Sequence, residues 1–368
     1  MAARPVAIVG SGLAAFCAYA TLRHGGLDPS EIVVFGPTDD PAHAWRSRAA
    51  AIRQRSMRSE SDGHCYPTSF PGLAVRTVRR RRSLRPLVQT VVDRYHPTVA
   101  EFLDHVAALR DRSGWDASLE RRRVERIAVT AGGFELDGSG PFAHVLVAPG
   151  HPGLARPAEL AEDRRSVHAY EPHDYAPSVA VVGAGQAAAT EWVNALDAGS
   201  TVLSVRRREP LRRPLNVPRP LLSRRGLRRF HATPAPERLE LLGRLLAPSY
   251  PPDRALDELL AYAEREGRFR VAEDVDGVDQ VICATGFVRG FQHDPLLRAL
   301  VEDHGVETAG HLIVLDPDST VPALTDARRT LALAGVPAQW AYPGADTLMG
   351  AKYAARRFLR RVARCRTR

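Results

Sequence analysis

The hydrophobic pattern of the chain contains the same unit twice: a short apolar run, a glycine-rich turn, and a stretch with helical periodicity. The first unit begins at Val6 and turns at residues 10–15, and the second begins at Val179 and turns at residues 183–188. Four or five consecutive apolar residues are typical of strands that are buried on both faces of a parallel sheet. The pattern therefore predicts an α/β protein with two Rossmann-like dinucleotide-binding domains, one built on each unit.

Both turns have the sequence Gly-x-Gly-x-x-Ala. The first glycine allows a sharp turn off the strand, the second lets a pyrophosphate approach the backbone, and the alanine keeps the following helix close to the sheet. The phosphates would then meet the free N–H groups at the start of that helix. One site plus a decayed duplicate is the alternative. The predicted contacts are Gly10, Ser11, Gly12 and Ala15 in the first turn, and Gly183, Gly185, Gln186 and Ala188 in the second.

Breaks in the pattern suggest how the two units are joined. Short alternating runs between residues 124 and 136 predict a β-meander, and the buried run that ends at Ala148 is followed by a Pro-Gly break. We expect a discontinuous first domain made of residues 1–150 and 280–368, with a parallel sheet plus the meander. The second domain, residues 151–279, is expected to be inserted into it.

The residues after the second strand of each unit bear on the choice of dinucleotide. An acid at this position binds the ribose 2′-hydroxyl, whereas arginine pairs with the 2′-phosphate of NADP. The second unit has Arg206 and Arg207 there, which favours NADPH. The first unit has Gly36 instead of an acid, and Asp39 and Asp40 follow as substitutes or as residues that form local turns.

The segment from His43 to Leu73 mixes aromatic, sulfur and arginine side chains without a regular period. It is predicted to be irregular, and long irregular connections inside a domain are usually functional. We expect it to form the floor of a cofactor pocket, with Trp45 and Met57 as apolar walls and Arg46 or Arg53 near negative charge. An ordinary surface excursion with Trp45 as a core residue is the alternative.

Composition limits the function classes. The chain has 368 residues, 44% of them hydrophobic, and carries a net charge of +9. Of its 51 basic residues only Lys352 is a lysine, and the arginines are spread along the whole chain, which argues against a nucleic-acid partner. The basic end, residues 356–368, is interpreted as a solvated helix face.

Cysteine, histidine and apolar spacing exclude further classes. Four scattered cysteines contain no C-x-x-C pair, and thirteen histidines show no metal-binding spacing, so neither a dithiol relay of neighbouring cysteines nor a metal site is expected. The first strand begins at once and no apolar run reaches membrane-spanning length, which predicts a cytoplasmic protein without a membrane partner. A homo-oligomer is compatible with the sequence.

The motifs together resemble the class B flavin-dependent monooxygenases. The resemblance is carried by the two glycine turns and by the sequence 284–287, Ala-Thr-Gly-Phe. Two further stretches are similar to the N-hydroxylating branch, which acts on lysine and ornithine: the sequence 215–218 with its Asn216, and the turn 344–349 with Asp346. Gly36 and the short chain depart from the family pattern.

The resemblance implies that the first domain binds FAD and the inserted domain binds NADP(H). The expected reaction transfers one oxygen of O2 to a small-molecule substrate, most simply by N-hydroxylation, through a flavin C4a-hydroperoxide. A flavin-dependent reductase acting on a small acceptor and a catalytically degenerate flavoprotein are the alternatives. Asp346 is also expected to cap a helix. The candidate catalytic residues are Asn216, Gln186 and Arg53, and the further cofactor contacts are Thr285, Gly286, Asp346, Thr347 and Leu348.

Overall fold

The first sheet has five parallel strands in the order β17-β7-β1-β2-β3. The computed structural model describes residues 5–57, 73–91, 95–213 and 217–366. Alternate residues of the central strands pack into separate cores on the two faces of the sheet, which explains why the strands are apolar throughout. The bounds are β1 Val6–Val9, β2 Ile32–Phe35, β3 Leu119–Glu120, β7 His144–Val147 and β17 Thr330–Leu333.

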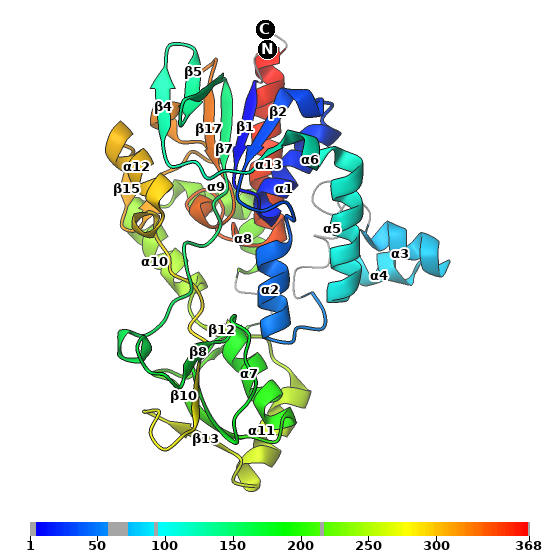
Figure 1. The fold of residues 1–368 in the computed structure, drawn as a ribbon, viewed down its shortest axis with the longest axis vertical. Helices are drawn as coiled ribbons and strands as arrows, with labels where there is room; N and C mark the ends of the chain where they lie inside the picture. Colours follow the sequence, from blue (N-terminus) through cyan, green and yellow to red (C-terminus); the bar gives the residue numbers. More distant parts are fainter. Residues whose placement is uncertain (1–4, 58–72, 92–94, 214–216, 367–368) are drawn as a thin grey trace.

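Helices cover one face of this sheet, and the predicted meander covers part of the other (Figure 1). Helix α1 (Leu13–His24) lies against the long C-terminal helix α13 (Leu348–Arg366), and α5 (Val99–Ser113) packs into the same core. Thr98 and Glu101 form a capping box at the start of α5. The meander strands are antiparallel: β4 Ile127–Thr130, β5 Gly133–Leu136 and β6 Ser139–Phe142.

The second sheet is also five-stranded and parallel, in the order β13-β10-β9-β14-β8. Helices α7 (Gln186–Asp197) and α11 (Arg254–Arg265) pack on one face around the fully buried Trp192. The predicted α/β fold with two Rossmann-like sheets is confirmed. The strands are β8 Ser166–His168, β9 Ser178–Val182, β10 Thr201–Val205, β13 Phe269–Ala272 and β14 Gln280–Cys283.

The sheets divide the chain differently from the predicted boundaries. Strand β14, which the boundary at residue 280 assigned to the first domain, pairs with β9 and β8 of the second sheet. Residues 219–245 of the expected insertion instead return to the first domain, because Phe230 and Leu242 are buried in its core. The apolar side chains of three amphipathic helices in this segment pack in that core. The helices are α8 Arg219–Leu222, α9 Arg224–Ala232 and α10 Ala235–Leu245.

The segment after Ala42 begins with a helix, which corrects the prediction of irregular structure. The side chain of Asp40 accepts a hydrogen bond from the Ala42 N–H, and the alanine-rich residues that follow form α2 (His43–Ala51). Helix α2 extends from the first sheet toward the second (Figure 1). Residues 58–72 lie outside the described part of the chain.

Two connections between the domains run antiparallel to each other. The Val288 N–H donates to Gly153 O at 3.0 Å, and the Ala155 N–H donates to Gly286 O at the same distance. The remaining short elements surround the sheets: α3 Leu73–Arg81, α4 Arg85–Val91, α6 Trp115–Ser118, β11 Leu211–Arg212, β12 Ser249–Tyr250, α12 Pro295–His304, β15 Thr308–Ala309 and β16 Leu312–Ile313.

Candidate cofactor site

The first glycine turn forms a tight corner between β1 and α1. Gly10 has φ +114°, and a Cβ placed on it would lie 2.2 Å from Ala148 O, so only glycine fits. Gly12 begins α1 without a side-chain cap, and a Cβ there would meet nothing within 4 Å. Ala15 is fully buried against the sheet. The corner therefore leaves uncapped N–H groups facing open space, which suits a phosphate.

The second turn repeats this construction in the other sheet. Gly183 has φ +138°, and a Cβ there would lie 2.5 Å from Ala284 O. Gly185 begins α7 without a side-chain cap, Gln186 is the first residue of the helix, and Ala188 is fully buried. A Cβ on Gly185 would make only ordinary contacts, at 3.9 Å from Pro248. Both turns thus have the open helix start that a dinucleotide pyrophosphate requires.

The missing acid of the first unit has a steric cause. A Cβ on Gly36 would lie 2.4 Å from Ser11 Cβ and 2.7 Å from Ser11 N, so no side chain fits there. Ser11 is buried, and its Oγ lies 2.9 Å from Thr38 Oγ1 and accepts a hydrogen bond from the Thr38 N–H. The serine between the two glycines therefore excludes the acid that the family pattern places at this strand end.

The two aspartates that follow form local interactions instead. Asp39 pairs with Arg121, and its carbonyl accepts a hydrogen bond from Trp115 Nε1 at 3.0 Å. Asp40 accepts a hydrogen bond from the Ala42 N–H just before α2 and pairs with Arg46 at 2.9 Å. The sequence left two alternatives for these aspartates, ribose binding and local interactions in the loop. The structure favours the local interactions.

The arginines after β10 differ in burial. The side chain of Arg206 is 14% exposed, and one of its guanidinium nitrogens pairs with Glu209 at 3.0 Å. Its Nε is buried and has no hydrogen-bond partner among the described residues. Arg207 is 91% exposed and lies 3.4 Å from Glu159. A buried donor without a partner is costly, so Arg206 is suited to receive an anionic group.

The start of α13 differs from the prediction in which residue caps the helix. Thr347 Oγ1 accepts a hydrogen bond from the Gly350 N–H at 3.3 Å, so Thr347 is the cap and Asp346 is not. Asp346 remains solvent-accessible, yet desolvation by the surrounding protein raises its pKa, opposed by Arg289. Leu348 is the first residue of the helix and packs against the α1 core.

The predicted pocket floor is partly core. Trp45 is half-buried, and its ring lies 4.6 Å from that of Phe102. Met57 is 5% exposed and belongs to the same core. Arg46 is half-exposed and bound to Asp40. The packing of Trp45 and Met57 therefore agrees with the alternative in which they are core residues, and Arg46 faces an aspartate of its own domain.

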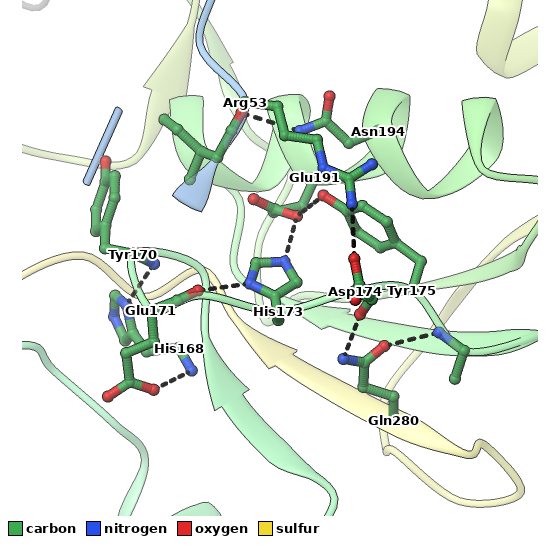
Figure 2. Close-up of polar contacts among 12 residues, drawn as sticks. Arg53, His168, Tyr170, Glu171, His173, Asp174, Tyr175, Glu191, Asn194 and Gln280 are labelled. Atoms are coloured by element: carbon green, nitrogen blue, oxygen red, sulfur yellow. Dashed lines mark hydrogen bonds and ion pairs between the residues drawn. The ribbon is translucent and has the colours of Figure 1, made fainter. Parts of the chain in front are cut away.

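Arg53 joins the two domains (Figure 2). Its guanidinium lies 4.7 Å from the ring of Tyr175 and pairs with Asp174 at 3.2 Å. Next to it, Asn194 Nδ2 donates to Ile52 O at 3.0 Å. Asp174 and Tyr175 precede β9, so they lie at the amino end of this strand, whereas Gly183 lies at its carboxyl end. Of the candidate catalytic residues, Arg53 thus makes a contact between the domains. Asn216 lies outside the described residues.

A buried hydrogen-bonded pair, His173 and Glu191, lies beneath Arg53 in the same view. His173 Nδ1 donates to Glu171 O at 2.7 Å, and Nε2 faces Glu191 Oε2 at 3.2 Å, so both nitrogens face acceptors. Burial alone would lower the pKa of His173, but the bonds to Glu191 and Glu171 outweigh it and raise this pKa. Tyr175 donates to the same Glu191 oxygen at 2.7 Å. His173 is therefore hydrogen-bonded through both ring nitrogens, one of them to the fully buried side chain of Glu191.

Sequence reasoning missed a polar cluster where the connections between domains meet the C-terminal part. Arg289 Nη1, Gln339 Nε2 and His151 Nδ1 are all buried without a hydrogen-bond partner among the described residues. Burial, with Arg48 and Arg289 nearby, lowers the pKa of His151 to about 3. Arg289 also acts on Asp346, so the cluster adjoins the start of α13. The cluster cannot be recognised from a local motif, because its residues are far apart in the sequence and meet only in the folded chain.

Aromatic stacking holds this region together. Phe287 lies between His151, at 3.9 Å between ring centroids, and Tyr170, at 5.0 Å, and the Arg48 guanidinium lies 4.7 Å from its centroid. Thr285 donates its hydroxyl to Ala155 O, and Gly286 O accepts from His168 Nε2 at 3.0 Å. Thr285 and Gly286, which were predicted to contact a cofactor, thus help to hold the two connections between the domains together.

Within the described ranges, the chain has no cluster of three side chains with the donor types that bind metals. In the same part of the chain, no helix combines the length and the apolar character needed to cross a bilayer. Neither finding conflicts with a site that is built for organic anions.

No protein-family model and no curated protein matches the sequence. Solved structures share its fold over nearly the whole chain. The ornithine N-hydroxylase KtzI of Kutzneria sp. 744, solved with reduced FAD, NADP+ and L-ornithine, superimposes with a TM-score of 0.73 at 16% identity and covers 99% of both chains. The ornithine hydroxylase PvdA of Pseudomonas aeruginosa gives 0.69 at 16% identity, covering 98% of this chain and 100% of its own.

A reductase has the same fold. The bacillithiol disulfide reductase Bdr of Bacillus cereus gives a TM-score of 0.60 at 14% identity and covers 97% of this chain and 99% of its own. The predicted resemblance to flavin-dependent N-hydroxylating monooxygenases is therefore confirmed for the fold, in which these enzymes are structural neighbours of the chain.

Proposed function

We propose that the protein is an FAD- and NADPH-dependent monooxygenase that transfers one oxygen atom of O2 to the nitrogen of a small-molecule amine. The observation that carries the proposal is the pair of matched corners at Gly10–Gly12 and Gly183–Gly185, each with an uncapped helix start. Two dinucleotide sites in one chain indicate transfer of electrons between two cofactors. The N-hydroxylase neighbours superimpose on nearly the whole chain.

The residues present fit these cofactors. The open helix start at Gly12 would hold the FAD pyrophosphate, and the turn at Asp346 and Thr347, before α13, would contact the remainder of this cofactor. Gly185 would hold the pyrophosphate of NADPH, and the partnerless Nε of Arg206 would take its 2′-phosphate. When both are bound, the cofactors supply hydride transfer and the activation of O2.

The protein's own contribution is binding and positioning. Arg53, Asn194 and the stacked ring of Phe287 join the two domains and would keep the two sites in a fixed relation. The hydrogen-bonded pair His173–Glu191 holds the loop before β9 against α7. No acid or base is assigned a proton transfer, because the reaction of a nucleophilic amine places its demands on cofactor position and on exclusion of water.

The test measures oxygen transfer directly. The protein is purified with FAD, and NADPH oxidation and O2 uptake are followed with ornithine, lysine and cadaverine as probes. Under ¹⁸O2, we expect an amine-dependent hydroxylamine product that carries one ¹⁸O atom. NADPH oxidation that requires an added quinone or disulfide and gives no labelled product would assign the protein to the reductases. A protein that binds neither cofactor would contradict both enzyme functions.

A further inference from the structure

A cavity of about 860 Å³ lies between helices α8 and α9 and one face of α13. Arg224 and Arg228, one helical turn apart on α9, line one side. Lys352, Arg356, Arg357 and Arg360 line the other side from α13. None of the glycine corners contributes to this lining, so the cavity is separate from both pyrophosphate sites.

The charge in the cavity is of one sign. Six cationic side chains line it, and no acidic side chain is among its described lining residues. Elsewhere on the surface, several arginines face acids, as in Arg126–Asp303 at 2.8 Å and Arg212–Asp257 at 2.7 Å. Asp318, beside the lining residue Pro317, pairs with Arg361 at 2.7 Å. Like charges gathered in a concave site create a strong attractive field for anions.

Lys352 distinguishes this cavity from a chance gathering of arginines. It is the only lysine of the chain, and it is 2% exposed. Its ammonium group lies in the cavity wall among the arginines and adds a fixed positive charge beside them. The sequence interpretation of the basic C-terminal run as a solvated helix face is therefore incomplete, because Arg356, Arg357 and Arg360 face a cavity with a buried cation in its wall.

Apolar and aromatic groups give the cavity a defined wall. The rings of Tyr342 and Tyr353 stack at 4.5 Å, and the Arg357 guanidinium lies 5.0 Å from the centroid of Tyr353. This stacking restricts the mobile arginine side chain and leaves its N–H groups for a ligand. His231 donates Nε2 to Ala341 O at 2.8 Å, and burial lowers its pKa, so it is a neutral part of the wall.

We propose that this cavity binds the phosphate or diphosphate group of a small molecule. Guanidinium groups form paired hydrogen bonds with phosphate oxygens, and a diphosphate carries enough charge to compensate several of the six cations. The free diamines and amino acids used by structural neighbours carry ammonium groups, which this lining would repel. The volume accommodates a ligand of nucleotide size, which favours a small molecule over a nucleic-acid strand.

The experiment measures binding of inorganic pyrophosphate by calorimetry to protein that is saturated with FAD and NADP+. The bound dinucleotides occupy the two glycine corners and remove them as competing sites. We expect binding that weakens as salt is raised. Arg228→Glu and Arg360→Glu are each expected to weaken it by at least tenfold. Both residues are exposed, so the variants should fold.

Arg225→Glu is the matched control. Arg225 is exposed on the same helix but is not among the lining residues, and the variant has the same net charge as Arg228→Glu. We expect it to change pyrophosphate binding less than twofold. Equal weakening by Arg225→Glu and Arg228→Glu, or no binding by the wild-type protein, would overturn the proposal.

A third outcome would change the partner class. If a 20-nucleotide single strand binds more tightly than pyrophosphate and depends on the same arginines, the cavity belongs to a nucleic-acid surface and the proposal is wrong. The measurement requires no turnover. Failure of amine hydroxylation would therefore leave pyrophosphate binding intact, and loss of pyrophosphate binding would leave NADPH oxidation intact.

Discussion

The two glycine corners are alike in backbone and different in what surrounds them. In both, the first glycine lies against the carbonyl of an alanine that follows the neighbouring strand, Ala148 in one sheet and Ala284 in the other. The first corner is then closed to any acid at Gly36 by Ser11, and its aspartates are bound to arginines of the same domain. The second has an arginine with a free buried donor, Arg206.

The comparison separates two tasks. The backbone corner binds a pyrophosphate, which every dinucleotide carries, so the same geometry serves both sites. The next strand end distinguishes one dinucleotide from another through the ribose, and there the two units diverge. At the second corner, the positive charge of Arg206 favours a phosphorylated ribose. At the first corner, no charged side chain of the described residues is left to bind the ribose.

The largest expected difference between the domains is their response to acid. Burial, with Arg76 and Arg112 nearby, lowers the pKa of His105 to about 4, and burial lowers that of His144 to about 4; both belong to the first domain. The unfolded chain binds these protons near pH 6.5, so the first domain loses stability as pH falls from about 6.5 to about 4. The loss is at most about 1.4 kcal/mol per pH unit for each histidine.

The sheet of the second domain responds less because the two histidines beside it oppose each other, whereas His151, with its pKa lowered to about 3, lies in the connection between the domains. The pKa of His168 is lowered by burial, whereas that of His173 is raised, so His173 stabilises below pH 6.5 and loses this effect as pH rises through its folded pKa. Hydrogen exchange of peptides at pH 7 and pH 5, corrected for intrinsic rates, should show the first domain opening first. Equal loss of protection in both domains would contradict this, and His105→Gln should reduce the difference.

Paired glycine variants test whether each corner serves one cofactor. A methyl group on Gly12 or Gly185 fits the folded protein but occupies the space of a phosphate. We expect Gly12→Ala to weaken FAD binding by about 100-fold, about 3 kcal/mol, without changing NADPH affinity, and Gly185→Ala to do the reverse. Fluorescence titration measures both affinities, and circular dichroism checks the fold. Loss of both cofactors in either variant would contradict separate sites.

Replacing Gly36 by the acid that the family pattern places at this strand end should destabilise the first corner. Gly36→Asp places a Cβ within 2.7 Å of three Ser11 atoms, so we expect a loss of about 2 to 3 kcal/mol in the free energy of unfolding. Gly243→Asp is the matched control, because a Cβ there meets nothing within 4 Å on the exposed side of α10. Urea denaturation measures both. A Gly36→Asp protein as stable as the control would refute the steric explanation.

The smallest effect concerns the 2′-phosphate. Arg206→Ala should weaken NADPH binding by about tenfold, equivalent to about 1.4 kcal/mol, and leave NADH binding unchanged. Arg207→Ala should matter less, because its side chain is 91% exposed. Titration of each variant with both nucleotides gives the ratio of its affinities for NADPH and NADH. If the Arg206→Ala variant loses affinity for NADH and NADPH equally, the residue supports the fold and does not select the 2′-phosphate.

Local pattern was enough to predict the units that bind phosphate. Each Gly-x-Gly-x-x-Ala turn is fixed by residues within ten positions of one another, and the apolar runs before them are buried as predicted. The capping box at Thr98 and Glu101 is likewise a short-range property. Such features are determined by neighbouring residues and keep their meaning in any tertiary context.

Other sites depend on residues that meet only in the folded chain. The sequence could not show that Ser11 excludes a side chain at Gly36, 25 positions later, or that Arg53 pairs with Asp174 in the other domain. It assigned β14 and helices α8–α10 to the wrong domains, because an apolar run does not specify which sheet or core it joins.

By itself, the sequence determined the two strand–turn–helix corners and the α/β class, since backbone freedom and apolar periodicity are local. Tertiary structure alone decided the domain boundaries, the partnerless donors at Arg206 and Arg289, and the basic cavity between α9 and α13. These depend on which surfaces exclude water from one another, and that is a property of packing between segments far apart in the chain.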